Sequence, residues 1–78
     1  MTKAQAIARM EALYGPQAVM EQRRATDVKR FPTLDRYAVG VRMTRRDSHT
    51  SIAWVRITGA GATWKEAVER AEDAEAMP

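Results

Sequence analysis

The chain has 78 residues, of which 45% are hydrophobic and 29% are charged, and its formal net charge at pH 7 is +3. A chain of this length forms one small domain, residues 1–78, that buries only about 60% of the surface of its unfolded state. The composition is typical of a globular protein and excludes a disordered tail. Because the sequence contains no cysteine, disulfides and thiolate metal sites cannot supplement the core, which leaves oligomerisation as a common means of stabilisation.

The first residues are too polar for a signal peptide, and no apolar run reaches the length of a membrane span. These features predict a soluble, cytoplasmic protein without a membrane partner. Arginine outnumbers lysine ten to three and alanine occurs fourteen times, a bias typical of GC-rich bacterial or phage genes.

Residues 2–14 are predicted to form a helix. Thr2 and Gln5 have the spacing of a capping box, in which each side chain binds a free backbone amide. The apolar residues at helical spacing are Ile7, Met10, Leu13 and Tyr14. Gly15 and Pro16 end the helix, because glycine accepts the left-handed cap and proline cannot continue the helix.

Residues 18–26 (AVMEQRRAT) are predicted to form an edge strand, because the segment is short and its charged side chains discourage unwanted pairing at a sheet edge. Residues 26–35 (TDVKRFPTLD) are predicted to form a loop, since Pro32 lacks an amide and forces Phe31 toward an extended conformation. We expect Phe31 and Leu34 to fold back onto the core and hold this long loop in place.

Two further strands, residues 36–44 and 51–58, are predicted from alternating side chains, with a polar hairpin connection at residues 45–50. The face that we expect helices to cover carries Tyr37, Val39, Val41, Ala53, Val55 and Ile57. The opposite face carries Arg36, Ala38, Gly40, Arg42, Ile52, Trp54 and Arg56.

A second helix is predicted over residues 63–76, directly after a glycine turn. Thr63 and Glu66 have the spacing of another capping box. The side expected to pack closely on the sheet is made of small or branched residues, namely Ala67, Val68, Ala71 and Ala74. The predicted fold class is therefore α+β, with the order α-β-β-β-α and both helices packed on one face of a three-stranded antiparallel sheet.

This order of elements, together with the passage ITGAGATWKEAVERAEDA, resembles the double-stranded RNA-binding domain. In that family a third strand bearing glycine enters the second helix through a Ser-Lys-Lys-x-Ala-Lys motif. Thr63 stands at the serine of this motif, Lys65 at the second lysine and Ala67 at the alanine, whereas Trp64 and Val68 replace the other two lysines. The resemblance implies the dsRBD-like fold and a phosphate contact by Lys65.

Two observations separate the chain from a typical member of that family. The Gly-Pro-x-His loop that reaches the minor groove is absent from the segment TDVKRFPTLD. The strand-glycine-Thr-Trp-Lys-Glu-Ala pattern also looks like the ends of small antitoxin-type proteins related to the HicB family.

Trp54 and Ile52 stand beside small residues and arginines on the uncovered face, an unusual composition for the solvent face of a monomer. In a purely structural interpretation, Trp54 lies across the gap left by Ala38 and Gly40, and arginine stems cover it. Alternatively the face is the interface of a homo-oligomer or binds another protein, since tryptophan and arginine are enriched in interfaces. A single aromatic is a small platform for stacking bases, so the sequence favours self-association.

Charge suggests the alternative partner, nucleic acid. Residues 23–56 carry nine basic and three acidic residues, whereas residues 63–78 carry five acidic and two basic ones. The candidate phosphate contacts are Arg23, Arg24, Lys29, Arg30, Arg45, Arg46 and Lys65. A nucleic-acid-binding module would use chiefly the hairpin and loop residues Arg42, Arg45, Arg46, Lys29 and Arg30, while the ordinary explanation is that these side chains keep a small protein soluble.

Catalytic chemistry finds little support in the sequence. His49 is the only histidine and lies in a polar segment beside Asp47 and Ser48, but a hydrolytic or metal site needs a third converging group and a pocket. The acidic residues near the end of the chain fall at helical surface spacing, as the ion pair expected between Lys65 and Glu69 illustrates. We expect no enzyme activity, no metal, no cofactor and no small-molecule substrate.

Overall fold

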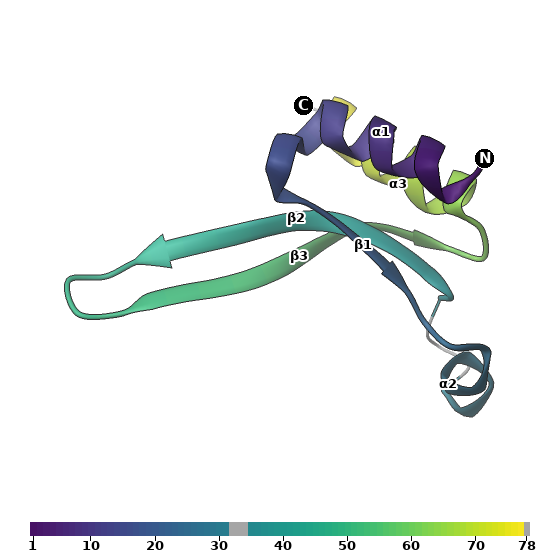
Figure 1. The fold of residues 1–78 in the computed structure, drawn as a ribbon, viewed down its shortest axis with the longest axis horizontal. Coiled ribbons are helices and arrows are strands. Elements are labelled where there is room, and N and C mark those ends of the chain that lie inside the picture. The colour runs from purple at the N-terminus through teal and green to yellow at the C-terminus, as the bar shows by residue number, and fades with distance from the viewer. Residues whose placement is uncertain (32–34, 78) are drawn as a thin grey trace.

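The computed structural model describes residues 1–31 and 35–77 and shows an α+β fold in the predicted order, with one additional short helix. The elements are α1 (Lys3–Tyr14), the 3-10 turn η1 (Gly15–Gln17), β1 (Ala18–Gln22), α2 (Ala25–Arg30), β2 (Tyr37–Arg46), β3 (Ser51–Gly61) and α3 (Trp64–Ala76). The strands form an antiparallel sheet in the order β1-β2-β3. Helices α1 and α3 lie side by side on one face of this sheet (Figure 1).

Side-chain caps define where the two long helices begin. At α1 the predicted capping box is confirmed: the Thr2 amide donates to Gln5 Oε1 at 2.8 Å, and the Gln5 amide donates to Thr2 Oγ1 at 3.2 Å. At α3 the Glu66 amide donates to Thr63 Oγ1 at 3.1 Å, but the Glu66 carboxylate accepts from the Ala62 amide. The second predicted box is therefore only half formed, and the acidic side chain caps the preceding turn instead.

The core lies between the two helices and the adjoining end of the sheet. Its buried members are Ala6, Met10, Val39, Trp64, Ala67, Val68 and Ala71. Trp64, which stands at a lysine position of the RNA-binding motif, is only 8% exposed and packs against Tyr37 with the ring centroids 4.6 Å apart. Ala74, which was predicted to belong to the packed side of α3, is exposed one turn beyond Ala71.

Close packing of α3 on β3 depends on a glycine. A Cβ atom placed on Gly59 would overlap the Ala67 carbonyl oxygen and would lie 2.7 Å from the Ala71 amide nitrogen. Both obstacles are helix backbone, which cannot rotate away as a flexible side chain could. The glycine turn seen in the sequence is thus part of a strand buried beneath the helix.

A β-bulge separates this buried part of β3 from the rest of the strand. Val39 pairs with Gly59, but the next residue, Gly40, pairs with Ile57, so Thr58 is an additional residue in β3. A bulge of this kind changes which residues of the strand face each side. We call the face that carries α1 and α3 the helix-side face, and the other the open face.

The predicted division of the third strand between the two faces is therefore wrong. Partners across an antiparallel pair lie on the same face, and the register places Trp54 opposite Met43, which shares a face with the buried Val39. Trp54 consequently lies on the helix-side face. Val55 and its neighbours Ala53 and Ile57, which were predicted to be covered by helices, lie on the open face and are exposed.

Tyr14 holds the bulge against the helix layer. Its hydroxyl oxygen lies 2.7 Å from Thr58 Oγ1 and 3.1 Å from Glu75 Oε1. Burial raises the pKa of Tyr14, the hydrogen bond with Thr58 lowers it, and the hydrogen bond with Glu75 raises it, so that the net direction is upward. Tyr14 ends α1 and its partners belong to β3 and α3, so this residue is a polar link between the three elements.

The helix α2 replaces part of the predicted loop at residues 26–35, and the first strand ends at Gln22 rather than at residue 26. Asp27 in its first turn and Lys29 and Arg30 in its last turn have the signs that a helix dipole favours. Phe31, expected to fold onto the core, is 51% exposed. The predicted roles of Pro32 and Leu34 fall outside the described residues.

Candidate interaction surface on the protruding hairpin

The ends of β2 and β3 form a hairpin that extends beyond the helices (Figure 1). The molecule measures 42 × 29 × 25 Å along its principal axes, and the hairpin runs along the longest of them. Residues 44–57 are all exposed. We call residues 42–57 the distal hairpin, and the part of the sheet under α1 and α3 the base.

The distal hairpin exposes large apolar side chains that the helices do not reach. The exposed fractions are 54% for Ile52, 43% for Trp54, 45% for Val55 and 42% for Ile57. Single exposed apolar residues are ordinary, but four within one short stretch of strand, two on each face, are more than scatter accounts for, and exposed apolar groups of this kind mark interaction sites. These four residues therefore make the distal hairpin the strongest candidate surface among the described residues.

The two faces of the distal hairpin have similar composition. The helix-side face carries Met43, Arg45, Ile52, Trp54 and Arg56. The open face carries Arg42, Thr44, Ala53, Val55 and Ile57. Apolar and basic side chains thus occur on both sides, and a partner that covered only one face would leave half of them in solvent.

The seven residues predicted to form one interaction face are divided by the bulge. Ile52, Trp54 and Arg56 share the helix-side face, whereas Ala38, Gly40 and Arg42 are paired with residues of the open face. Of the latter group Ala38 and Gly40 are buried, so they cannot provide the gap that Trp54 was expected to cover. The seventh residue, Arg36, is exposed beside β2 with its guanidinium 5.7 Å from the centre of the Tyr37 ring.

The arginines of the distal hairpin differ from those at the base of the molecule, such as Arg9 and Arg70, in lacking acidic partners among the described residues. Among the described residues, no ion pair joins an acidic side chain to Arg42, Arg45, Arg46 or Arg56. By contrast Arg9 is paired with Glu72, and Arg70 with Glu66 at 2.7 Å. The positive charge of the hairpin is thus free to meet an acidic partner.

The remaining candidate phosphate contacts lie elsewhere and are partly engaged. Arg23 contacts Glu21 at 3.4 Å and donates to the Asp35 carbonyl at 2.7 Å, and Lys65 lies 4.0 Å from Glu69. Arg24, Lys29 and Arg30 belong to the region of α2, which lies at the opposite end of the molecule from the hairpin turn (Figure 1). The structure does not bring the predicted basic residues into one continuous surface.

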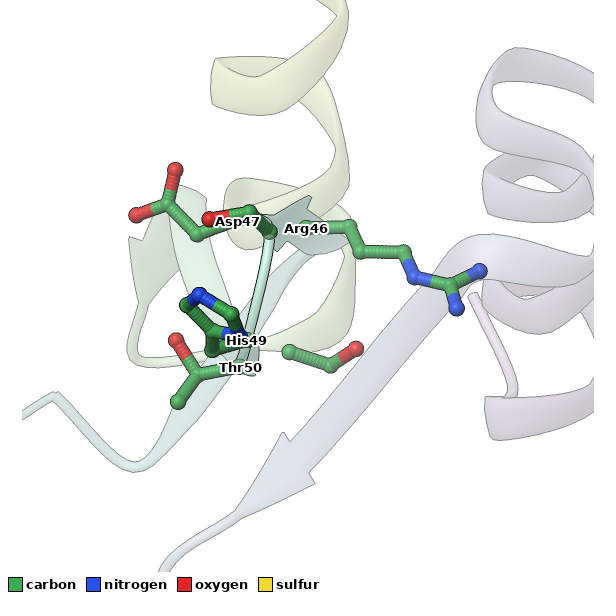
Figure 2. Close-up of a pocket in the computed structure, with 6 residues that line it drawn as sticks. Arg46, Asp47, His49 and Thr50 are labelled. Atoms are coloured by element: carbon green, nitrogen blue, oxygen red, sulfur yellow. The ribbon is translucent and has the colours of Figure 1, made fainter.

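The hairpin turn contains the only histidine, but no converging site. The Asp47 amide donates to the Thr50 carbonyl at 2.8 Å, which closes the turn. Figure 2 shows the Arg46 guanidinium extending away from Asp47 and His49. All residues of the turn are exposed, and no group of three metal-binding side chains occurs in the described part of the chain.

The outer edge of β3 was not predicted from the sequence as a candidate surface. Because the strand order is β1-β2-β3, this eleven-residue strand pairs on one side only. A run of β-branched and aromatic residues with a single charge, as in SIAWVRI, is the signal that could have indicated an unprotected edge.

Comparison with known proteins found no matching family model, no matching curated protein and no matching solved structure. The resemblance to the double-stranded RNA-binding domain therefore rests on the order of elements and on the residues quoted for it. Within residues 1–31 and 35–77, no helix is long and apolar enough to cross a membrane.

Proposed function

We propose that this protein is a non-enzymatic assembly module that associates with a second copy of itself through the distal hairpin, with Trp54 as the principal contact. The observation that carries the proposal is the exposure of Ile52, Trp54, Val55 and Ile57 on a hairpin that the helices leave uncovered. Such an association would also extend the small core, which a chain of this size without disulfides has few other ways to supplement.

Trp54 is expected to contribute most to the interface. Its side chain is large, it is 43% exposed, and it is flanked on its face by Ile52 and Arg56. Tryptophan and arginine are the residue types most enriched where interface energy concentrates, and truncation of such a residue costs about 2 kcal/mol or more. A loss of that size weakens a dimer about thirtyfold.

Light scattering coupled to size exclusion, over a range of protein concentrations, tests the proposal. We expect a dimer that dissociates on dilution, and we expect Trp54→Ala to shift the midpoint to at least about thirtyfold higher concentration. Leu13→Ala is the matched control, because Leu13 is 37% exposed but lies on α1. A monomer at every concentration, or equal effects of the two substitutions, would contradict the proposal.

A second candidate function is nucleic-acid binding by the same hairpin, with Lys29 and Arg30 as additional contacts. The observation that favours it is the absence of acidic partners for Arg42, Arg45 and Arg46 within the described residues. Phosphate binding by such side chains releases counterions and weakens steeply with salt. The resemblance to the double-stranded RNA-binding domain supports this candidate by fold, which by itself does not determine function.

Titration of labelled single-stranded and duplex oligonucleotides at several salt concentrations separates the two candidates. If the hairpin binds phosphates, Arg46→Gln should lower affinity and reduce the salt slope by about one. Lys3→Gln removes the same charge from α1 and should have little effect. Absence of any salt-sensitive binding, with dimerisation intact, would eliminate the second candidate and leave the first.

A further inference from the structure

Hydrogen-bonded and non-hydrogen-bonded residue pairs alternate along the hairpin, and this alternation determines which backbone groups β3 presents at its free edge. The bond from the Asp47 amide to the Thr50 carbonyl makes these two residues a hydrogen-bonded pair. Such pairs alternate with non-bonded pairs along an antiparallel ladder. By this alternation, the backbone groups of Ile52, Trp54 and Arg56 bond to β2. The amide and carbonyl groups that point outward belong to Ser51, Ala53, Val55 and Ile57.

A second hydrogen bond, at the other end of the sheet, leads to the same assignment of outward residues. The Arg23 amide donates to the Arg36 carbonyl at 2.7 Å, so Ala38 and Gly40 direct their backbone groups toward β1. Val41, one residue further along, must then bond to β3, where its partner is Arg56. Two independent observations therefore assign the same outward residues.

One end of this edge is closed and the other is open. Ala60, beyond the bulge, directs its carbonyl outward, and Arg70 Nη1 donates to it at 2.5 Å. Glu66 holds the Arg70 guanidinium in that position at 2.7 Å. Among the described residues no side chain caps the carbonyls of residues 51–57 in this way.

The open part of the edge also lacks the devices that normally prevent strand pairing. Proteins protect such edges with proline, with several charges, or with short strands. Residues 51–57 form an extended run without proline and with Arg56 as their single charge. The bulge at Thr58 is the C-terminal limit of the regular edge.

Resting on the proposed self-association, we infer that β3 pairs with β3 of a second copy in antiparallel orientation, with the two-fold axis at Val55. In this register Val55 faces its own counterpart, and Ala53 faces Ile57 of the second copy. The outward backbone groups of both copies then bond to one another, and the two sheets join into one of six strands.

Side-chain chemistry selects this register. Centred on Val55, it places Trp54 opposite Arg56 of the second copy, twice, where a guanidinium can lie on the indole face. An axis at Arg56 would put the two arginines directly opposite each other, which is unfavourable. An axis at Trp54 would place Ile52 opposite Arg56 of the second copy and lose both cation-aromatic contacts.

Charge complementarity supports the same arrangement. With Ala53 opposite Ile57 of the second copy, the turn end of each hairpin would extend toward the base of the other copy, where α3 packs over Gly59. Arg45, which lies near the turn end of the hairpin on the helix-side face, would be on the same side of the joined sheet as that helix. Helix α3 carries five acidic and two basic residues, so the basic hairpin of each copy would meet the acidic helix of the other.

Cysteine cross-linking tests the inference, because the sequence contains no other cysteine. In a hydrogen-bonded antiparallel pair the Cα atoms lie about 5.5 Å apart, which is within the range of a disulfide. Under mild oxidation Val55→Cys should therefore convert most of the dimer into a covalent dimer. Ala53→Cys is the matched control, since its two copies would be about 14 Å apart along the strands and should not cross-link.

The edge pairing and the proposed self-association can be contradicted separately. If light scattering shows a dimer but Val55→Cys does not cross-link, or Ala53→Cys cross-links equally well, the edge pairing at Val55 is wrong while self-association stands. If scattering shows a monomer at all concentrations, the proposed function itself fails. Both substituted positions are exposed, and unchanged circular dichroism spectra would show that the variants retain the fold.

Discussion

The base and the distal hairpin share the strands β2 and β3, yet they have opposite relations to solvent. At the base Val39 is fully buried beneath α1 and α3, whereas in the distal hairpin Val55 is 45% exposed. Both are β-branched residues of paired antiparallel strands. The difference therefore arises from what covers the strands, since the two helices of one copy extend over only part of the sheet.

The base is covered by helices of its own chain, whereas the proposed assembly assigns the completion of the hairpin to a second copy. The base has helices packed on it, capped helix ends and a glycine fitted to helix backbone. The hairpin has apolar groups on both faces, arginines without acidic partners among the described residues, and an unpaired edge. In the inferred arrangement a second copy would pair with this edge.

The largest expected effect is at the closest packing contact of the base. Gly59→Ala should destabilise the protein by about 3 kcal/mol, because the added Cβ meets helix backbone that cannot yield locally. Ser51→Thr adds a single carbon at an exposed position of the same strand and should change stability by less than about 0.5 kcal/mol. Urea unfolding measures both, and a tolerated Gly59→Ala would show that α3 does not pack tightly on β3.

A smaller effect separates the two valines directly. Val39→Ala should cost about 2 kcal/mol, since it removes buried methyl groups and leaves a cavity. Val55→Ala should change the stability of the monomer by less than about 0.5 kcal/mol. Urea titrations at a concentration too low for dimerisation give the comparison. Equal costs would mean that the hairpin is covered within a single chain.

The smallest of these effects concerns the link between the helix layer and the bulge. Tyr14→Phe should cost about 1 kcal/mol, because it removes the hydrogen bonds with Thr58 and Glu75. Since the pKa of Tyr14 is raised from 10.0, the folded protein retains this proton more strongly than the unfolded chain. Its contribution to stability is full below pH 10 and declines as the pH rises from there through the folded pKa.

The measurement is urea unfolding at about pH 8 and about pH 11, where an ordinary tyrosine is protonated and largely ionised, respectively. Stability of the natural sequence should fall more between the two values than that of Tyr14→Phe. An identical fall in both proteins would show that Tyr14 has the same pKa folded and unfolded, and that its hydrogen bonds do not anchor the bulge.

The sequence predicted the order of elements because local signals mark each boundary. Thr2 and Gln5 fix the start of α1, and Gly15 with a positive φ of 64° follows its end. Thr63 caps α3, and the alternation in β2 and β3 is regular on each side of the bulge. These features depend on residues close together in the chain, which a sequence shows directly.

The division of β3 between two faces could not be predicted in the same way. It depends on one additional residue, Thr58, whose position is set by the register against β2 and by contact with Tyr14, forty-four residues away. Nothing local in the segment RITGAG distinguishes a bulge from continued alternation. Of the predicted surface, Ile52, Trp54 and Arg56 do lie on one exposed face, whereas Ala38 and Gly40 are buried. The free edge of β3 is evident only from the strand order.

Site-resolved amide hydrogen exchange at low and high protein concentration tests most directly whether a second copy completes the distal hairpin. The amides of Ala53, Val55 and Ile57 point outward and should exchange rapidly in the monomer, whereas those of Trp54 and Arg56 bond to β2. Raising the concentration through the dimerisation range should slow exchange at the three outward amides by about tenfold or more. Rapid exchange at these positions at every concentration would contradict the account.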